Sequence, residues 1–160
     1  MLKLRTEAVQ RDALLRTMEA YTFAFNASAS WGFKNGTHNR IRNHRGTYFF
    51  IRAEIPNLNS GLVQAARDCA CAALKRDKLK KLPNRRINAA IRYNKNSSRI
   101  VLNHGFVSLS TIIGRIKLHF YCSKYLDKFK DWRVVNSVLV YDKKVKDFFF
   151  RSNSREANPT

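Results

Sequence analysis

The second half of the chain consists of short runs of β-branched or aromatic residues. Six such runs read AAIRYN, SRIVL, FVSLS, GRIKLHFYC, WRVVNSVLVY and KDFFFR, and polar stretches such as NKNSS and NHG separate them. Within GRIKLHF, Arg115, Lys117 and His119 alternate with apolar residues, which predicts a strand with one cationic face and one buried face. Strands at this spacing are typical of a small barrel rather than a flat sheet. We therefore predict a small antiparallel β-barrel.

The first half of the chain changes from a strand pattern to a helical one. Leu2 to Val9 alternates as a half-buried strand does. From Gln10 to about Ala29, apolar residues recur at helical spacing. Residues 30–52 contain three of the six glycines and have no sustained period, which predicts a loop, with a short helix inside it as the alternative. After Pro56, an alanine-rich helix is predicted, with Asn59 or Ser60 as its N-cap.

The charge of the chain limits its partners. Its 160 residues include 31 Lys and Arg against 11 Asp and Glu, a formal net charge of +20. This excess is larger than solubility requires and attracts polyanions, so nucleic acid is the predicted partner and an anionic membrane surface is the alternative. No apolar run reaches the length of about 18 residues that spans a bilayer, and no signal-peptide pattern follows Met1. We expect a cytoplasmic protein.

Three features of the helical half could touch nucleic acid. The N-terminus of the second helix near Ser60 offers free N–H groups to a phosphate, and Gln64 could read adenine or be an ordinary exposed glutamine. Lys75 to Lys81 with Arg85 and Arg86 forms a dense cationic strip, for which the alternative is a solvated charge run. Aromatic side chains on the first helix could stack on bases, but we interpret them as core packing. They are Tyr21, Phe23 and Phe25.

The residue patterns of the common catalytic and metal sites are missing. A two-metal nuclease needs convergent carboxylates, whereas the acids here are spaced as surface acids are. They include Asp12, Glu19, Asp68, Asp77, Asp127, Asp131, Asp142 and Asp147. Cys69, Cys71 and Cys122 do not have zinc spacing, even with His104 and His119, and are interpreted as small buried hydrophobes. We expect no catalytic residue, no metal and no cofactor.

The order of the parts adds a family resemblance. The first helix carries the pattern Q-x3-LL-x4-A-x2-FA-x-N, and IPNLNSGLVQAARDCACAALK, IRYNKNSSRIVL and VSLSTIIGRIKLHF follow it. Over nearly all of residues 1–152 this combination resembles the N-terminal half of TnpB (OrfB) proteins encoded by insertion sequences, especially archaeal ones. Members of that family look like ancestors of type V CRISPR effectors. They have a wedge β-barrel interrupted by a helical recognition insert, followed by a RuvC-like nuclease domain and a zinc ribbon.

The resemblance implies an α+β fold in which an OB-like wedge barrel is interrupted after its first strand. Residues 1–9 would be that strand, 10–84 the inserted helical recognition segment, 85–152 the rest of the barrel, and 153–160 a linker or disordered tail. The family's function implies two partners, a guide RNA from the transposon end and a short motif in double-stranded DNA. The expected DNA-motif contacts are Ser60, Gln64, Arg92, Tyr93 and Asn94. Further expected nucleic-acid contacts are the cations Lys3, Arg5, Lys78, Lys80, Lys81, Arg85, Arg86, Arg115 and Lys117.

The resemblance ends after FFFRSN. The family's aspartate-bearing nuclease strand is expected there, but the sequence reads SREANPT. We therefore expect a non-catalytic, nucleic-acid-binding portion of a TnpB-like protein, located in a prokaryotic cytoplasm and associated with the nucleoid. Three alternatives stay open: a stand-alone regulator of the transposon, an enzyme half that assembles with a separately encoded nuclease half, and a non-functional gene fragment.

Overall fold

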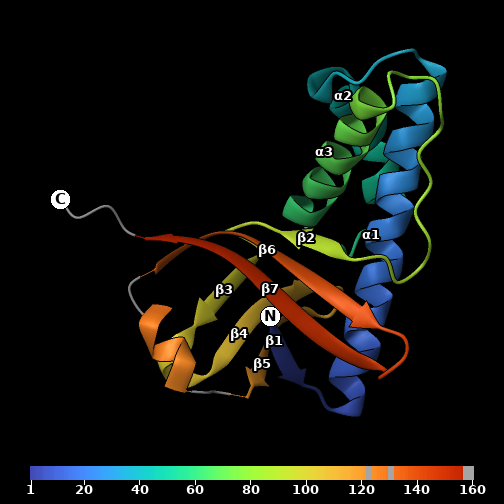
Figure 1. Cartoon of the computed structure of the whole chain (residues 1–160). Helices are drawn as coiled ribbons and strands as arrows, with labels where there is room; N and C mark the ends of the chain where they lie inside the picture. The colour runs from blue at the N-terminus through green and yellow to red at the C-terminus, as the bar shows by residue number, and fades with distance from the viewer. Residues whose placement is uncertain (122–123, 130–131, 157–160) are drawn as a thin grey trace.

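The computed structural model describes residues 1–121, 124–129 and 132–156. Three helices follow the first strand, and the rest of the sheet follows the helices (Figure 1). The helical elements are α1 (Ala8–Lys34), α2 (Arg40–Glu54), α3 (Ser60–Arg76) and the short 3-10 helices η1 (Leu102–His104) and η2 (Lys124–Phe129). The strands are β1 (Leu2–Arg5), β2 (Ile91–Tyr93), β3 (Ser98–Val101), β4 (Phe106–Thr111), β5 (Gly114–Phe120), β6 (Trp132–Asp142) and β7 (Asp147–Glu156).

The strands form one nearly closed, barrel-like antiparallel sheet. Its order is β2-β6-β7-β1-β5-β4-β3, so β1 joins the two halves of the sheet. Leu2 pairs with Phe150 of β7, and Leu4 pairs with Phe120 of β5. The predicted fold class is confirmed: the protein is α+β, and a small antiparallel barrel is interrupted after its first strand by a helical insert. All six predicted strands of the second half are present.

The first strand is shorter than the pattern predicted. β1 ends at Arg5, and α1 begins at Ala8, so the predicted strand to Val9 is wrong at its end. The helix begins early because Glu7 and Gln10 form a reciprocal capping box, in which the Glu7 backbone N–H donates to Gln10 Oε1 at 3.0 Å. At the other end α1 continues to Lys34, beyond the predicted boundary near residue 29.

The packed side of α2 is largely polar, which explains why the sequence predicts a helix here only as the alternative. Residues 40–54 form α2, where the sequence predicted a loop with a short helix inside it as the alternative, so a helix is present. Asn43, Thr47 and Ile51 are buried on it, and Asn43 Nδ2 donates to the Ser28 carbonyl of α1 at 2.8 Å. Thr47 donates to the Asn43 carbonyl at 2.8 Å. Hydrogen bonds of Asn43 and Thr47 therefore add to the packing of Ile51 in the core, at positions where apolar residues would normally indicate a packed helix. The Asn39 side chain caps it by accepting from two backbone N–H groups.

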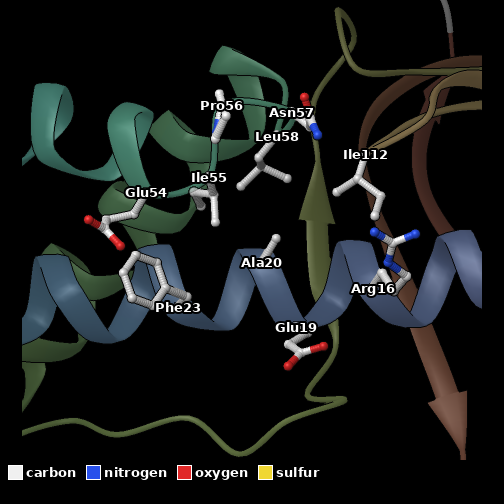
Figure 2. A pocket seen from close by; sticks show the side chains of 10 residues that line it. All are labelled: Arg16, Glu19, Ala20, Phe23, Glu54, Ile55, Pro56, Asn57, Leu58 and Ile112. Carbon is white, nitrogen blue, oxygen red and sulfur yellow. The ribbon is translucent and has the colours of Figure 1, made fainter.

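The aromatic residues of α1 do not all pack in the core. Tyr21 and Phe25 are buried, as predicted, but Phe23 is 38% exposed. Phe23 lies on the side of the helix that borders a cavity beside Glu54 and Ile55 (Figure 2). The helical period places it away from the buried stripe, so its assignment to the core was wrong.

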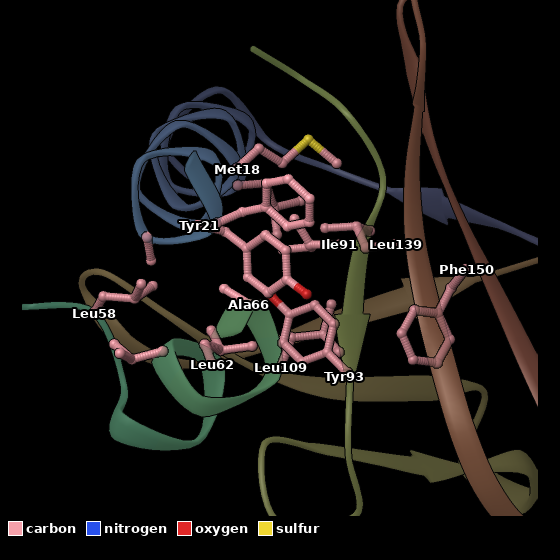
Figure 3. Close-up of a cluster of buried hydrophobic side chains, with 14 of the residues drawn as sticks. Met18, Tyr21, Leu58, Leu62, Ala66, Ile91, Tyr93, Leu109, Leu139 and Phe150 are labelled. Atoms are coloured by element: carbon pink, nitrogen blue, oxygen red, sulfur yellow. The ribbon is translucent and has the colours of Figure 1, made fainter. Parts of the chain in front are cut away.

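A single hydrophobic core joins the helical insert to the sheet (Figure 3). Met18 and Tyr21 of α1 and Leu62 of α3 lie in the same cluster as Tyr93 of β2 and Phe150 of β7. The Tyr93 and Phe150 rings are 6.5 Å apart between centroids. The insert and the barrel therefore share their buried surface, and the helices fix the position of β2 directly.

The predicted C-terminal linker is partly a strand. β7 continues to Glu156, and Asn153 pairs with Asn136 of β6, so residues 153–156 belong to the sheet. The backbone of this segment pairs with β6 and so continues the strand. Its sequence is polar and has no apolar alternation from which a strand could be predicted. Residues 157–160 lie outside the described residues, as do Cys122 and Asp131. In the part of the chain that the structure describes, no helix has the length and apolarity needed to cross a membrane.

Candidate nucleic-acid interface

A cavity lies between the C-terminal end of α3, the loop that follows it and β2. Its volume is about 600 Å³. Among the described residues, four cationic side chains but a single carboxylate line it: Arg76, Lys81, Arg85, Arg92 and Asp77. Sequence reasoning selected three of these cations as contacts but not Arg76. We call this cavity the basic groove.

Several contacts fix Arg85 in the lining of the basic groove. Asn26 of α1 binds its backbone twice, accepting from the Arg85 N–H at 2.8 Å and donating to the Arg85 carbonyl at 3.1 Å. The guanidinium carbon lies 5.1 Å from the Phe25 ring centroid and 5.5 Å from that of Tyr21. The guanidinium also donates to the Ala90 carbonyl. Arg85 therefore provides a positive charge whose position is set before any ligand arrives.

The single carboxylate of the basic groove is already paired. Asp77 lies 2.9 Å from Arg76, and the hydrogen bond from that guanidinium lowers the pKa of Asp77. Lys81 and Arg92 are exposed, and no described carboxylate lies within 4 Å of either. The basic groove consequently keeps a net positive charge at neutral pH.

The other cations of the predicted strip surround the basic groove without lining it. Lys78 and Leu79 both have left-handed backbones, with φ of 50° and 58°, and the Leu79 N–H donates to the Leu74 carbonyl at 3.0 Å. This turn ends α3 and leaves Lys78 and Lys80 exposed beside it. Arg86 is also exposed. These side chains can add to the potential around the basic groove but do not shape it.

A second cationic surface covers the outer side of β1, β5, β4 and β3. Cross-strand pairing sets His119 opposite Arg5 and Phe106, and sets Ser108 opposite Lys117 and Arg99. Alternation on β5 is as predicted, because the cationic side chains are exposed while Leu118 and Phe120 are buried. We call this surface the barrel face. Its residues are Lys3, Arg5, Arg99, Phe106, Arg115, Lys117, His119 and Tyr121.

Two of the predicted cations on the barrel face also have structural partners. Lys3 Nζ lies 2.9 Å from Asp147, and the hydrogen bond to that carboxylate raises the pKa of Lys3. Arg115 donates to the Asn96 carbonyl at 2.6 Å. Lys117 instead lies over a ring, with its Nζ 4.9 Å from the Phe106 centroid.

Tyr93 is not at the surface, so its predicted contact with DNA is not possible in this structure. It is fully buried, and its hydroxyl donates to the Ser110 carbonyl at 2.9 Å. The strand period of β2 explains the difference, because it turns Arg92 outward and Tyr93 inward. The Asn94 side-chain oxygen accepts from the Asn96 N–H at 2.9 Å and so stabilises the turn after β2.

Ser60 and Gln64 are exposed on the first turns of α3. A Cβ on Gly61 would lie 3.7 Å from Asn94 Nδ2, so Asn94 is next to this helix end. Gln64 lines a separate hollow of about 310 Å³, together with Arg40 and other residues of α2 and α3. The structure therefore places Gln64 away from the basic groove.

A third cavity, shown in Figure 2, differs in charge from the basic groove. It has a volume of about 400 Å³ and an apolar floor that includes Leu58 and Ile112. Glu19, Glu54 and Arg16 are its charged lining residues. Carboxylates repel phosphate, so this cavity is not part of the candidate interface.

Neither a protein-family model nor a curated protein matches this chain. Among the described residues, no group of three or more His, Cys, Asp or Glu side chains could hold a metal ion. Cys71 is buried, as predicted, and burial raises the pKa of its thiol, whereas Cys69 is only half-buried.

Sequence reasoning did not select five residues of these surfaces as contacts: Arg76, Arg99, Phe106, His119 and Tyr121. For four of them a signal was available, because strand alternation in SRIVL, FVSLS and GRIKLHFY places them outward. Arg76 lies within the predicted cationic strip, but nothing in that strip distinguished it, since its position depends on where α3 ends.

Proposed function

We propose that this protein binds nucleic acid through the phosphate backbone. The observation that carries the proposal is the basic groove, where three cations converge on one cavity whose single described carboxylate is already paired with Arg76, in a chain with a net charge of +20. Preformed cationic sites bind phosphates with little loss of side-chain entropy, and the displaced counterions supply much of the affinity. The barrel face adds a second row of cations on the same molecule.

Within this proposal, the resemblance to TnpB proteins suggests the partners. They would be RNA from a transposon end and a short motif in double-stranded DNA. The adjacency of Asn94 to the N-terminal end of α3 supports the idea that Ser60, Gln64 and Asn94 act on one duplex. Selection from a pool of random duplexes tests this point: Gln64→Ala should lose any base preference of the wild type while keeping its overall affinity.

The proposal is tested by removing charge at two places. Lys81→Gln with Arg92→Gln removes two cations of the basic groove, and Lys143→Gln with Lys144→Gln removes two exposed cations from the β6–β7 turn. Binding to a labelled duplex and to a structured RNA is measured at several salt concentrations. The groove variant should bind more weakly, with a salt slope shallower by about 1.8, while the turn variant stays close to wild type.

Two outcomes would contradict the proposal. Equal losses in both variants would mean that only total charge matters. Tighter binding to vesicles containing phosphatidylserine than to either nucleic acid would assign the cations to an anionic membrane surface.

A further inference from the structure

The barrel face combines its cations with accessible aromatic rings. Tyr121 is 56% exposed, and the Arg5 guanidinium carbon lies 4.1 Å from its ring centroid. Phe106 is half-buried, with Lys117 Nζ 4.9 Å from its centroid. The His119 ring lies 6.2 Å from that of Phe106. Each of the two larger rings therefore has a cation against one side.

Strand register brings these rings together. His119 pairs with Arg5 of β1 on one side and with Phe106 of β4 on the other, so the three lie in one row across the sheet. Tyr121 follows His119 by two residues in the chain and shares its face. The opposite face of β5 carries Phe120 into the core. The outward rings are therefore additional to those that stabilise the fold.

Small and cationic side chains fill the space beside the rings. Ser108 lies between Lys117 and Arg99 in the cross-strand pairing, so the surface is low at its middle and positive at both sides. The sequences of β1, β3, β4 and β5 contain no Asp or Glu. A phosphate chain that crosses this surface would meet cations on β1, β5 and β3, and these strands and β4 present no carboxylate to it.

We infer that the barrel face binds unpaired nucleotides of a single-stranded nucleic acid. Tyr121 stacks on a base, and Arg5 and Lys117 hold the flanking phosphates. An accessible ring can stack only on a base whose own face is free, and in a duplex those faces are covered by neighbouring base pairs. The inference rests on the proposed function and deepens it, because the basic groove by itself needs only phosphates.

The test distinguishes contacts with bases from contacts with phosphates. Fluorescence anisotropy compares a thymidine dodecamer, an abasic dodecamer with the same number of phosphates, and a duplex of the same length. The thymidine dodecamer should bind more tightly than the abasic one. Tyr121→Ala should weaken binding of the thymidine dodecamer by about 5- to 150-fold, the range found for a base stacked on an aromatic residue. The same variant should bind the abasic dodecamer as the wild type does, and its circular dichroism spectrum should match that of the wild type.

Two further variants serve as controls for Tyr121→Ala. Tyr121→Phe keeps the ring and should keep the affinity, and Phe49→Ala removes an 80% exposed ring from α2 and should change nothing. Equal affinity of the wild type for the thymidine and abasic dodecamers would overturn the inference, as would an equal loss of both in Tyr121→Ala. If no probe binds in a salt-dependent way, the proposed function itself fails. Steep salt dependence without a preference for bases removes only the inference about unpaired nucleotides.

Discussion

Removing the hydroxyl of Tyr93 should destabilise the protein without weakening nucleic-acid binding. This hydroxyl donates to the Ser110 carbonyl at 2.9 Å in a fully buried position. Because β2 and β3 stand at opposite ends of the strand order, this bond links β2 to β4 across the open seam of the barrel. Tyr93→Phe keeps the ring against Phe150 and removes only the donor.

The expected cost follows from the burial. A lost hydrogen bond that leaves its partner buried costs about 1–3 kcal/mol, and the Ser110 carbonyl would be left without this donor. For a domain of this size, the melting temperature should fall by roughly 2–10 °C. Urea unfolding followed by circular dichroism measures the free energy, and anisotropy with a labelled duplex measures the binding.

Tyr121→Phe is the matched control, because it removes a phenolic oxygen from an exposed ring. It should unfold as the wild type does. If Tyr93→Phe unfolds as the wild type does but binds duplex more weakly, Tyr93 belongs to the interface, and the reasoning from burial is refuted.

Two further substitutions test the electrostatics and the polar helix packing. Asp147→Asn should lower the free energy of unfolding, because the hydrogen bond from Lys3 lowers the pKa of the Asp147 carboxyl. That contribution should be present at pH values above the ordinary carboxyl pKa and should vanish as the pH falls through the lowered one, which urea unfolding from neutral to acid pH can follow. Asn43→Ala should cost about 1–3 kcal/mol, since it removes a buried donor to the Ser28 carbonyl, and the exposed Asn35→Ala is its control. Equal unfolding of the two variants would contradict the polar packing of α2.

The sheet could be predicted because its strands follow the simplest pattern. In β5, cationic and apolar residues alternate, and the two sets point to opposite faces. The same rule places Tyr93 in the core, but the family resemblance led us to predict it as a contact with DNA. At this position, strand alternation predicts the burial of the side chain better than the family resemblance does.

The two elements whose extent the sequence did not predict, α2 and the end of β7, show little apolar periodicity. The packed side of α2 begins with Asn43 and Thr47, whose partners lie on another helix or one turn away. The end of β7 is polar and depends on pairing with β6. A search for apolar periodicity has little signal for either, because polar contacts replace apolar ones on most of the packed side of α2 and along the end of β7.

The candidate site was predicted in composition but not in arrangement. Lys75 to Lys81 with Arg85 and Arg86 were identified as one strip, whereas the structure places Lys81 and Arg85 in the basic groove together with Arg92, and leaves Lys78 and Lys80 beside it. The separation arises from the left-handed turn that ends α3 and from the clamp of Asn26 on Arg85. Such contacts cannot be inferred from spacing along the chain.

The most direct test of nucleic-acid binding is the salt dependence of the wild-type affinity for a duplex. If the basic groove and the barrel face together neutralise about eight phosphates, the logarithm of the association constant should fall against the logarithm of salt concentration with a slope of roughly −7. Binding should then be tight at low salt and weak at high salt. A slope near zero, or no binding at low salt, would contradict the account.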